Sequence, residues 1–105
     1  MNKLTLTIAE PWFSMIRDGK KKEEYREIKP YYESRFYENI MSLSESGELE
    51  FGRDFKRFAI LVLRNGYRAD SPTIMLKKPK IRIGTGRPEW GAEPGKNYFV
   101  ITWEE

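Results

Sequence analysis

The sequence predicts an α+β domain: a small mixed β-barrel of five or six strands with two helices outside it. Short segments with alternating apolar residues recur along the chain, and two helix-like patterns lie in its first half. No helical pattern separates the last three strands, which favours a barrel over the alternative, a doubly wound βαβ sheet. With 105 residues, we expect one domain spanning residues 1–105.

The N-terminal segment predicts a strand followed by a short helix. Leucine and isoleucine alternate with threonine across "LTLTI", residues 4–8, which is the period of a half-buried strand. Pro11 suits the first turn of a helix, and Trp12 and Ile16 then fall on one stripe. Gly19 stands where such a helix ends.

The charged segment from Lys20 to Ile28 predicts a second strand, because no helical stripe of apolar residues can be drawn through it. Plain alternation places Lys21 on the face opposite to Glu24 and Arg26. A turn at Lys21, a later strand start or a local bulge would change that arrangement.

The rest of the chain predicts a second helix and three more strands. Pro30 begins the helix, and its apolar stripe is expected to continue through Phe36 to Ile40 and Leu43, before a polar loop. The strands are expected in "RFAILVLRNGY" (57–67), as the central strand, in "TIMLKKPKIRIG" (73–84), with Pro79 at an edge or bulge, and in "NYFVITW" (97–103). Between the last two, the Gly- and Pro-rich loop containing Trp90 is expected to be structured.

Composition excludes several kinds of chemistry. The chain has no cysteine and no histidine, which removes disulfides, thiolate nucleophiles, imidazole bases and the common zinc sites, and we expect no metal and no cofactor. Neither a signal peptide nor a membrane-spanning stretch is recognisable, so we expect a cytoplasmic protein with no membrane partner. The net charge is only +3. An acid-free basic ribbon nevertheless contains Lys77, Lys78, Lys80, Arg82 and Arg87.

The run "DGKKKEEYREIKP", residues 18–30, allows two interpretations. Surface charges of this density most often form solvated pairs that contribute about 0 to 1 kcal/mol each. Alternatively, the segment provides the floor of a site, because Tyr25 offers a stacking plane and Arg26 a planar fork of donors beside carboxylates.

The order of residues from Pro11 to Arg26 resembles the signature of the ASCH domain, a family of PUA-like barrels whose motif reads Gly-x-Lys-x-x-Glu-x-Arg after the first helix. The segment "IRIGTGRPEWGAEPGKNYFVI", residues 81–101, is similar to the closing segment of small ASCH proteins. The motif falls on Gly19, Lys21, Glu24 and Arg26. The resemblance implies a cleft at one end of the barrel that binds RNA or a modified nucleoside or nucleotide.

The same resemblance implies an alternative activity. One branch of the superfamily hydrolyses the acetyl amide of acetylated cytidine with a Lys, a Thr and a Glu. Lys21 matches the Lys, so Lys21 and Glu24 are the candidate catalytic residues. Glu24 occupies the Thr position, where a carboxylate cannot simply replace a hydroxyl nucleophile, and Glu89 is the nearest candidate for the Glu.

The chemistry of these side chains fits a ligand cleft. Lysine binds phosphate as a point charge, arginine binds phosphate or a base edge with its fork, and glutamate accepts from an exocyclic amine. An aromatic ring can stack on a base, although Trp90 can equally plug the end of a barrel. The candidate ligand-binding residues are Gly19, Lys21, Glu24, Tyr25, Arg26, Arg82, Arg87, Glu89 and Trp90.

Overall fold

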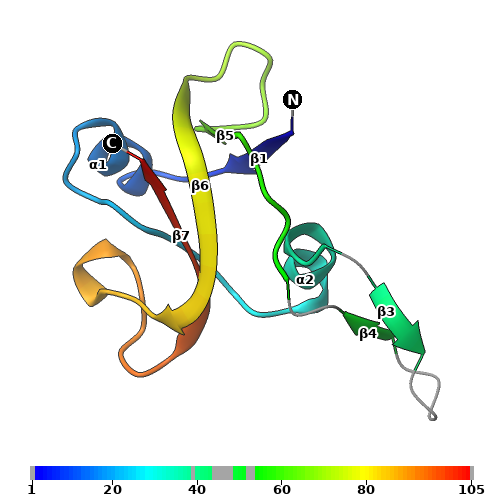
Figure 1. The fold of residues 1–105 in the computed structure, drawn as a ribbon. Helices are drawn as coiled ribbons and strands as arrows, with labels where there is room; N and C mark the ends of the chain where they lie inside the picture. The colour runs from blue at the N-terminus through cyan, green and yellow to red at the C-terminus, as the bar shows by residue number, and fades with distance from the viewer. Residues whose placement is uncertain (1, 39, 44–48, 52–53, 105) are drawn as a thin grey trace.

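The computed structural model describes residues 2–38, 40–43, 49–51 and 54–104. Its main feature is a five-stranded mixed sheet with the order β1-β5-β6-β7-β2 (Figure 1). These strands are β1 (Lys3–Thr7), β5 (Ile60–Arg64), β6 (Thr73–Thr85), β7 (Asn97–Glu104) and β2 (Glu24–Arg26). β1 runs parallel to β5, and the other neighbours are antiparallel. The predicted α+β class is therefore confirmed.

The second predicted strand is shorter than expected, and the second helix ends early. β2 contains only Glu24–Arg26, so the turn before it removes Lys21 from the strand alternation. Helix α2 (Pro30–Phe36) ends where Tyr37 becomes extended, and its ring stacks on Phe55 at 4.9 Å between centroids. Continuing the helix through residues 40–43 is thus wrong. Those residues form β3 (Ile40–Leu43), which pairs with β4 (Leu49–Phe51).

The sheet is not closed into a barrel, contrary to the sequence expectation. β1 and β2 are its two edges, and no backbone ladder joins them in the part of the chain that the structure describes. β6 bends at an irregularity in its pairing with β7 between Lys77 and Lys80, where Pro79 lacks an N–H and Lys78 has a positive φ of 49°. The long β6 therefore curls across the molecule (Figure 1).

The alternation of residues along β7 separates two apolar clusters. Phe99 and Ile101 point into the main core, with the leucines of β1 and β5 and with Phe36. Tyr98 and Val100 point to the other face, where Ala92 and the half-buried Tyr25 cover them. The 86–96 loop therefore packs on the sheet as a second layer, and both faces of β7 are covered.

The first helix, α1 (Trp12–Arg17), buries Phe13 and Ile16 against the core. Its expected end at Gly19 is confirmed, because Gly19 has the left-handed φ of 76° that glycine adopts without strain. Trp12, expected on the buried stripe, is only half-buried. None of the described helices has the length and apolar character needed to span a bilayer.

Candidate functional site

Three charged side chains of the predicted motif form one buried network. Lys21 is 1% exposed and Glu24 is 6% exposed. The Lys21 ammonium lies 3.4 Å from Glu24 Oε1, and the Arg26 guanidinium lies 2.7 Å from Glu24 Oε2. The interpretation of residues 18–30 as a fully solvated charged segment is therefore wrong for these residues, although Lys20, Lys22 and Glu27 are exposed.

Two local structures bring the network together. After α1, the amides of Lys20 and Lys21 both donate to the carbonyl of Met15, which turns the chain back under the helix. β2 then pairs with β7, with Glu24 opposite Ile101. Lys21 is thus placed by a turn, whereas Glu24 and Arg26 share one face of a strand.

The Lys21 ammonium is enclosed by partners of several kinds. It donates to the carbonyl of Trp90 at 2.7 Å, and it lies 4.6 Å from the Tyr25 ring centroid and 5.4 Å from that of Trp12. Burial lowers the pKa of Lys21 from its ordinary value, while the charge and hydrogen bond of Glu24 act in the opposite direction. Lys21 therefore connects α1, β2 and the 86–96 loop.

Arg26 links the two edges of the sheet. Besides Glu24, its guanidinium donates to the Thr7 carbonyl on β1 at 2.8 Å and to the Tyr32 hydroxyl on α2 at 3.1 Å. Burial by itself lowers the pKa of Arg26, but Glu24 and Tyr32 outweigh it and raise the pKa above the ordinary value. Its Nε is buried and finds no acceptor among the described residues.

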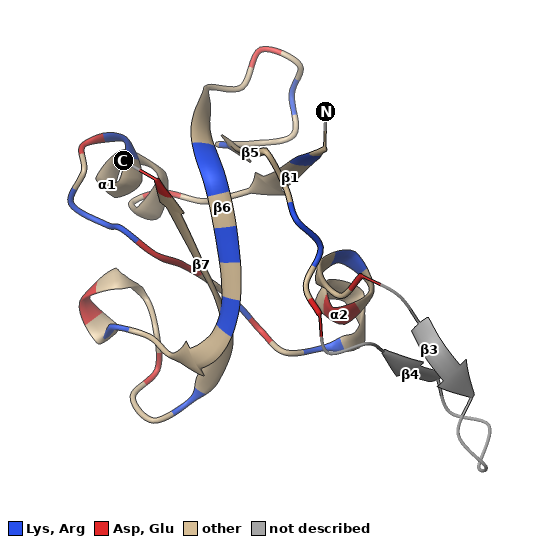
Figure 2. Ribbon diagram, in the orientation of Figure 1, with Lys and Arg blue, Asp and Glu red and all other residues tan. Residues whose placement is uncertain are grey.

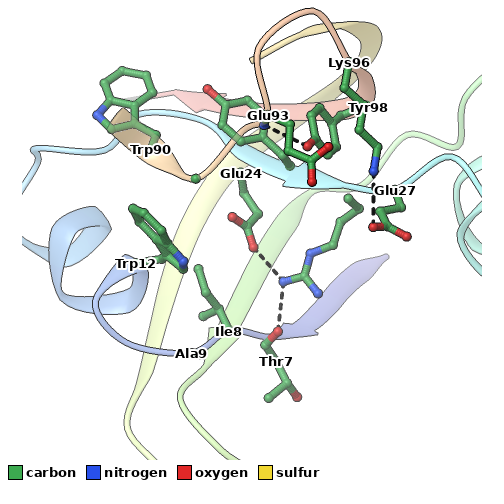
Figure 3. A pocket seen from close by; sticks show the side chains of 13 residues that line it. Thr7, Ile8, Ala9, Trp12, Glu24, Glu27, Trp90, Glu93, Lys96 and Tyr98 are labelled. Carbon is green, nitrogen blue, oxygen red and sulfur yellow. Dashed lines mark hydrogen bonds and ion pairs between the residues drawn. The ribbon is translucent and has the colours of Figure 1, made fainter. Parts of the chain in front are cut away.

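A cavity of about 380 Å³ opens beside this network, between β2, the end of β1, α1 and the 86–96 loop (Figure 3). Its aromatic wall contains Trp12, Tyr25, Trp90 and Tyr98. Figure 3 shows Trp12 and Trp90 on one side of the cavity, with Glu24 between them and the Lys96 side. Aromatic walls with a few convergent polar groups are typical of sites for small organic ligands.

The polar groups that line the cavity are mainly acidic. Three carboxylates, Glu24, Glu27 and Glu93, face two cations, Arg26 and Lys96. Lys96 lies 3.4 Å from Glu27 at the rim. Because carboxylates outnumber cations in the lining, the cavity favours groups that donate hydrogen bonds over free phosphate.

Tyr25 forms a fixed platform under the 86–96 loop. Its hydroxyl accepts from the Arg87 amide at 3.0 Å and donates to Glu23 at 2.7 Å. The pKa of Tyr25 is raised to about 12, mainly by burial and also by Glu23, while the hydrogen bond from the Arg87 amide acts in the opposite direction. A Cβ on Gly86 would lie 2.6 Å from the Tyr25 ring, so this close packing requires glycine.

The structure brings only part of the predicted set to the cavity. Glu24, Tyr25, Arg26 and Trp90 line it, and Lys21 lies behind them. The other four candidates, Gly19, Arg82, Arg87 and Glu89, do not line it.

Two of those four, Arg82 and Arg87, make their contacts outside the cavity. Arg82 forms an ion pair with Glu23 at 3.0 Å, and the Arg87 guanidinium lies 4.9 Å from the Trp90 ring centroid. Glu89 is exposed on the 3₁₀ turn Pro88–Trp90, so it is not placed beside Lys21 and Glu24. The basic residues of β6 recur along that strand (Figure 2).

Sequence reasoning missed several lining residues: Thr7, Trp12, Glu27, Glu93, Lys96 and Tyr98. The signal at Trp12, its place on the apolar stripe of the first helix, predicted core packing and not a cavity wall. Glu93 and Lys96 had none, because loop residues show no periodicity that reports their direction. Among the described residues, no group of three or more Asp, Glu, His or Cys side chains is arranged to hold a metal ion.

Comparisons with protein-family models, with curated proteins and with solved structures find no match to this chain. Membership of the ASCH family therefore stays a prediction. The functional conclusion depends on the chemistry of the cavity and of the buried network behind it.

Proposed function

We propose that the cavity binds the base of a nucleoside-derived ligand, either free or as part of an RNA, at one end of an ASCH-type, PUA-like fold. The observation that carries this proposal is the fixed orientation of Glu24. Each of its carboxylate oxygens is held by a cation, Lys21 or Arg26, and the group still lines an aromatic cavity. A carboxylate held in this way provides a directional acceptor for an exocyclic amine.

Stacking supplies the second element of recognition. Trp12 and Trp90 stand on one side of the cavity and present π surfaces of the size of a nucleobase (Figure 3). Base–aromatic stacking contributes about 1–3 kcal/mol per base in single-strand binding proteins. The acidic lining favours a neutral nucleoside moiety over a phosphate inside the cavity.

Hydrolysis of a nucleoside amide, such as that of acetylated cytidine, is the alternative. It is favoured by the lowered pKa of Lys21, which brings the amine closer to a proton-accepting form. Binding fits the geometry better, because the Lys21 ammonium is fully engaged by Glu24 and the Trp90 carbonyl and lies behind the cavity wall. In this arrangement Lys21 is a positioning residue for Glu24.

The test is a binding screen with nucleosides, followed by tryptophan fluorescence, since two of the three tryptophans line the cavity. We expect a nucleoside with an exocyclic amine to bind, and Glu24→Gln to weaken it at least about tenfold by removing the charged acceptor. Trp90→Ala, which keeps the carbonyl that holds Lys21, is expected to cause a similar loss. The matched control is Glu104→Gln, an exposed carboxylate paired with Lys78.

Equal affinity of wild type and both cavity variants would contradict the proposal. A separate incubation with acetylated cytidine distinguishes the alternative, because only hydrolysis releases cytidine and acetate. Turnover that is lost in Lys21→Met and Glu24→Gln, while both variants remain folded, would replace binding by hydrolysis as the function of the cavity.

A further inference from the structure

A second concave surface lies between β1 and α2, next to the cavity. This groove has a volume of about 320 Å³ and meets the cavity at Thr7 and Arg26, which line both. The residues that give it its character are Arg26, Lys29, Tyr31, Tyr32, Arg35 and Tyr67. Neither the sequence motif nor the proposed function assigns these residues apart from Arg26.

The groove is more basic than the cavity. Its lining contains three basic side chains and no carboxylate, whereas the cavity lining contains three carboxylates and two cations. Arg35 is fixed by hydrogen bonds to the Tyr31 hydroxyl at 3.2 Å and to the Thr5 carbonyl at 3.0 Å. This arrangement leaves a localised positive surface suited to phosphate groups.

Aromatic rings alternate with these cations. The Arg35 guanidinium lies 5.7 Å from the Tyr31 ring centroid, and the Lys29 ammonium lies 5.5 Å from that of Tyr32. Tyr31 is 58% exposed, and Tyr67, on the turn after β5, is 90% exposed. Tyrosines with this exposure contribute little to the core, so their rings are available for stacking.

We infer that this groove binds a single-stranded nucleic acid, with bases stacked on Tyr31 and Tyr67 and phosphates on Lys29 and Arg35. Positive charge interleaved with exposed aromatic rings is the pattern by which proteins hold single strands without reading their sequence. The groove adjoins the cavity, with which it shares Thr7 and Arg26, so one strand can place a base in the cavity while its neighbours occupy the groove. This inference goes beyond the proposed function, which a free nucleoside satisfies.

The groove fits a strand better than the basic ribbon of β6 does. Two of the ribbon residues are already paired with carboxylates: Lys78 lies 3.5 Å from Glu104, and Arg82 lies 3.0 Å from Glu23. The exposed large hydrophobic side chains of β6 are Met75 and Ile83, which offer no aromatic plane. Phosphate binding there would compete with existing ion pairs and gain no stacking.

The experiment measures binding of a fluorescently labelled single-stranded oligonucleotide of about eight nucleotides, within the usual site size, across a range of salt concentrations. Tyr67→Ala removes one stacking plane at an exposed loop position, and Tyr67→Phe keeps the plane. Lys29→Gln removes one groove cation, and Lys80→Gln, its matched control, removes one exposed cation from β6.

We expect Tyr67→Ala to weaken oligonucleotide binding about tenfold and Tyr67→Phe to bind within about twofold of wild type. Lys29→Gln is expected to lower the slope of log affinity against log salt by about 0.7, while Lys80→Gln leaves it unchanged. RNA and DNA of one sequence are compared to identify the preferred sugar; a Tyr67-dependent loss with either polymer supports the groove.

Unchanged binding in Tyr67→Ala, or an equal change of slope in Lys29→Gln and Lys80→Gln, would overturn the inference. Equal competition by an oligoglutamate peptide would also overturn it and assign the groove to an acidic protein segment. Nucleoside binding is measured in parallel on Tyr67→Ala and is expected to be unchanged. If the cavity binds no nucleoside, the oligonucleotide assay therefore still tests the groove on its own.

Discussion

At the residue scale, the most unusual feature is a network of three charges within six residues of sequence, in which Lys21 and Glu24 are buried and the Arg26 side chain is 15% exposed. Taking an ion out of water costs several kcal/mol, and a close counter-ion recovers this only with good geometry and further hydrogen bonds. Here the Trp90 carbonyl serves Lys21, and the Thr7 carbonyl serves Arg26. The network therefore fixes the positions of its members rather than simply adding to stability.

Tyr25 allows a test by pH, because its pKa is raised from 10.0 to about 12 in the folded protein. The unfolded chain loses this proton near pH 10 and the folded chain near pH 12, so the stabilising contribution is fully present below pH 10 and is lost as pH rises through 12. We expect the stability difference between wild type and Tyr25→Phe to fall by about 1–2 kcal/mol over that range, allowing for partial solvent exposure.

The measurement is urea unfolding of both proteins at a series of alkaline pH values. The pKa of Lys21 is lowered, so its contribution has the opposite sign, but it is present in both proteins and cancels in the difference. Parallel stability curves for wild type and Tyr25→Phe would show that the hydroxyl of Tyr25 is not held as the structure describes.

At the scale of elements, the 86–96 loop is the part of the fold that forms the cavity wall. It contacts β2 through Gly86 on Tyr25, α1 through Gly91 on Trp12, and the buried network through the Trp90 carbonyl. Gly91 has a φ of 102°, a conformation that side chains rarely adopt. The loop is thus shaped by close backbone contacts with two aromatic rings.

Gly86→Ala is expected to destabilise the protein by roughly 1–3 kcal/mol, because its Cβ would lie 2.6 Å from the Tyr25 ring and 2.7 Å from the Ala92 Cβ. It should also shift the tryptophan emission and weaken nucleoside binding by displacing the cavity wall. Gly95→Ala is the control. Its Cβ meets nothing within 4 Å, so only the strain of a φ of 75°, about 1 kcal/mol, is expected. Nucleoside binding reduced equally in both variants would contradict the steric explanation.

At the scale of the whole molecule, Arg26 compensates for the open sheet. β1 and β2 are opposite edges, yet the guanidinium of Arg26 on β2 reaches the Thr7 carbonyl on β1 and the Tyr32 hydroxyl on α2. A single planar group with several donors therefore connects elements that no backbone ladder joins among the described residues. The curvature of β6 brings the two edges within its reach.

Arg26→Lys is expected to lower the free energy of unfolding by roughly 2–4 kcal/mol, because lysine keeps the charge but cannot reach three acceptors in a fixed fork. Hydrogen exchange at the end of β1 should accelerate in this variant. Arg17→Lys is the matched control: Arg17 pairs with the adjacent, exposed Asp18, at 3.0 Å, and the change should cost less than about 0.5 kcal/mol. Similar losses in both variants would show that Arg26 does not join the sheet edges.

The sequence alone determined those elements whose signals are local. Alternation fixed the two faces of β7 and of β1, and the Pro11 to Gly19 segment specified α1 together with its end, because such patterns depend on neighbours a few residues apart. The motif also pointed to Glu24, Tyr25 and Arg26. Each of these lines the cavity.

Only the tertiary structure decided which charges are buried and what surrounds them. Lys21 is identical in type to the exposed Lys20 and Lys22, and its burial depends on the Trp90 carbonyl, 69 residues away. Likewise, α2 ends at Tyr37, whose ring stacks on Phe55 from a later segment of the chain. Such contacts join distant segments, and composition and periodicity carry no information about which distant segments will meet.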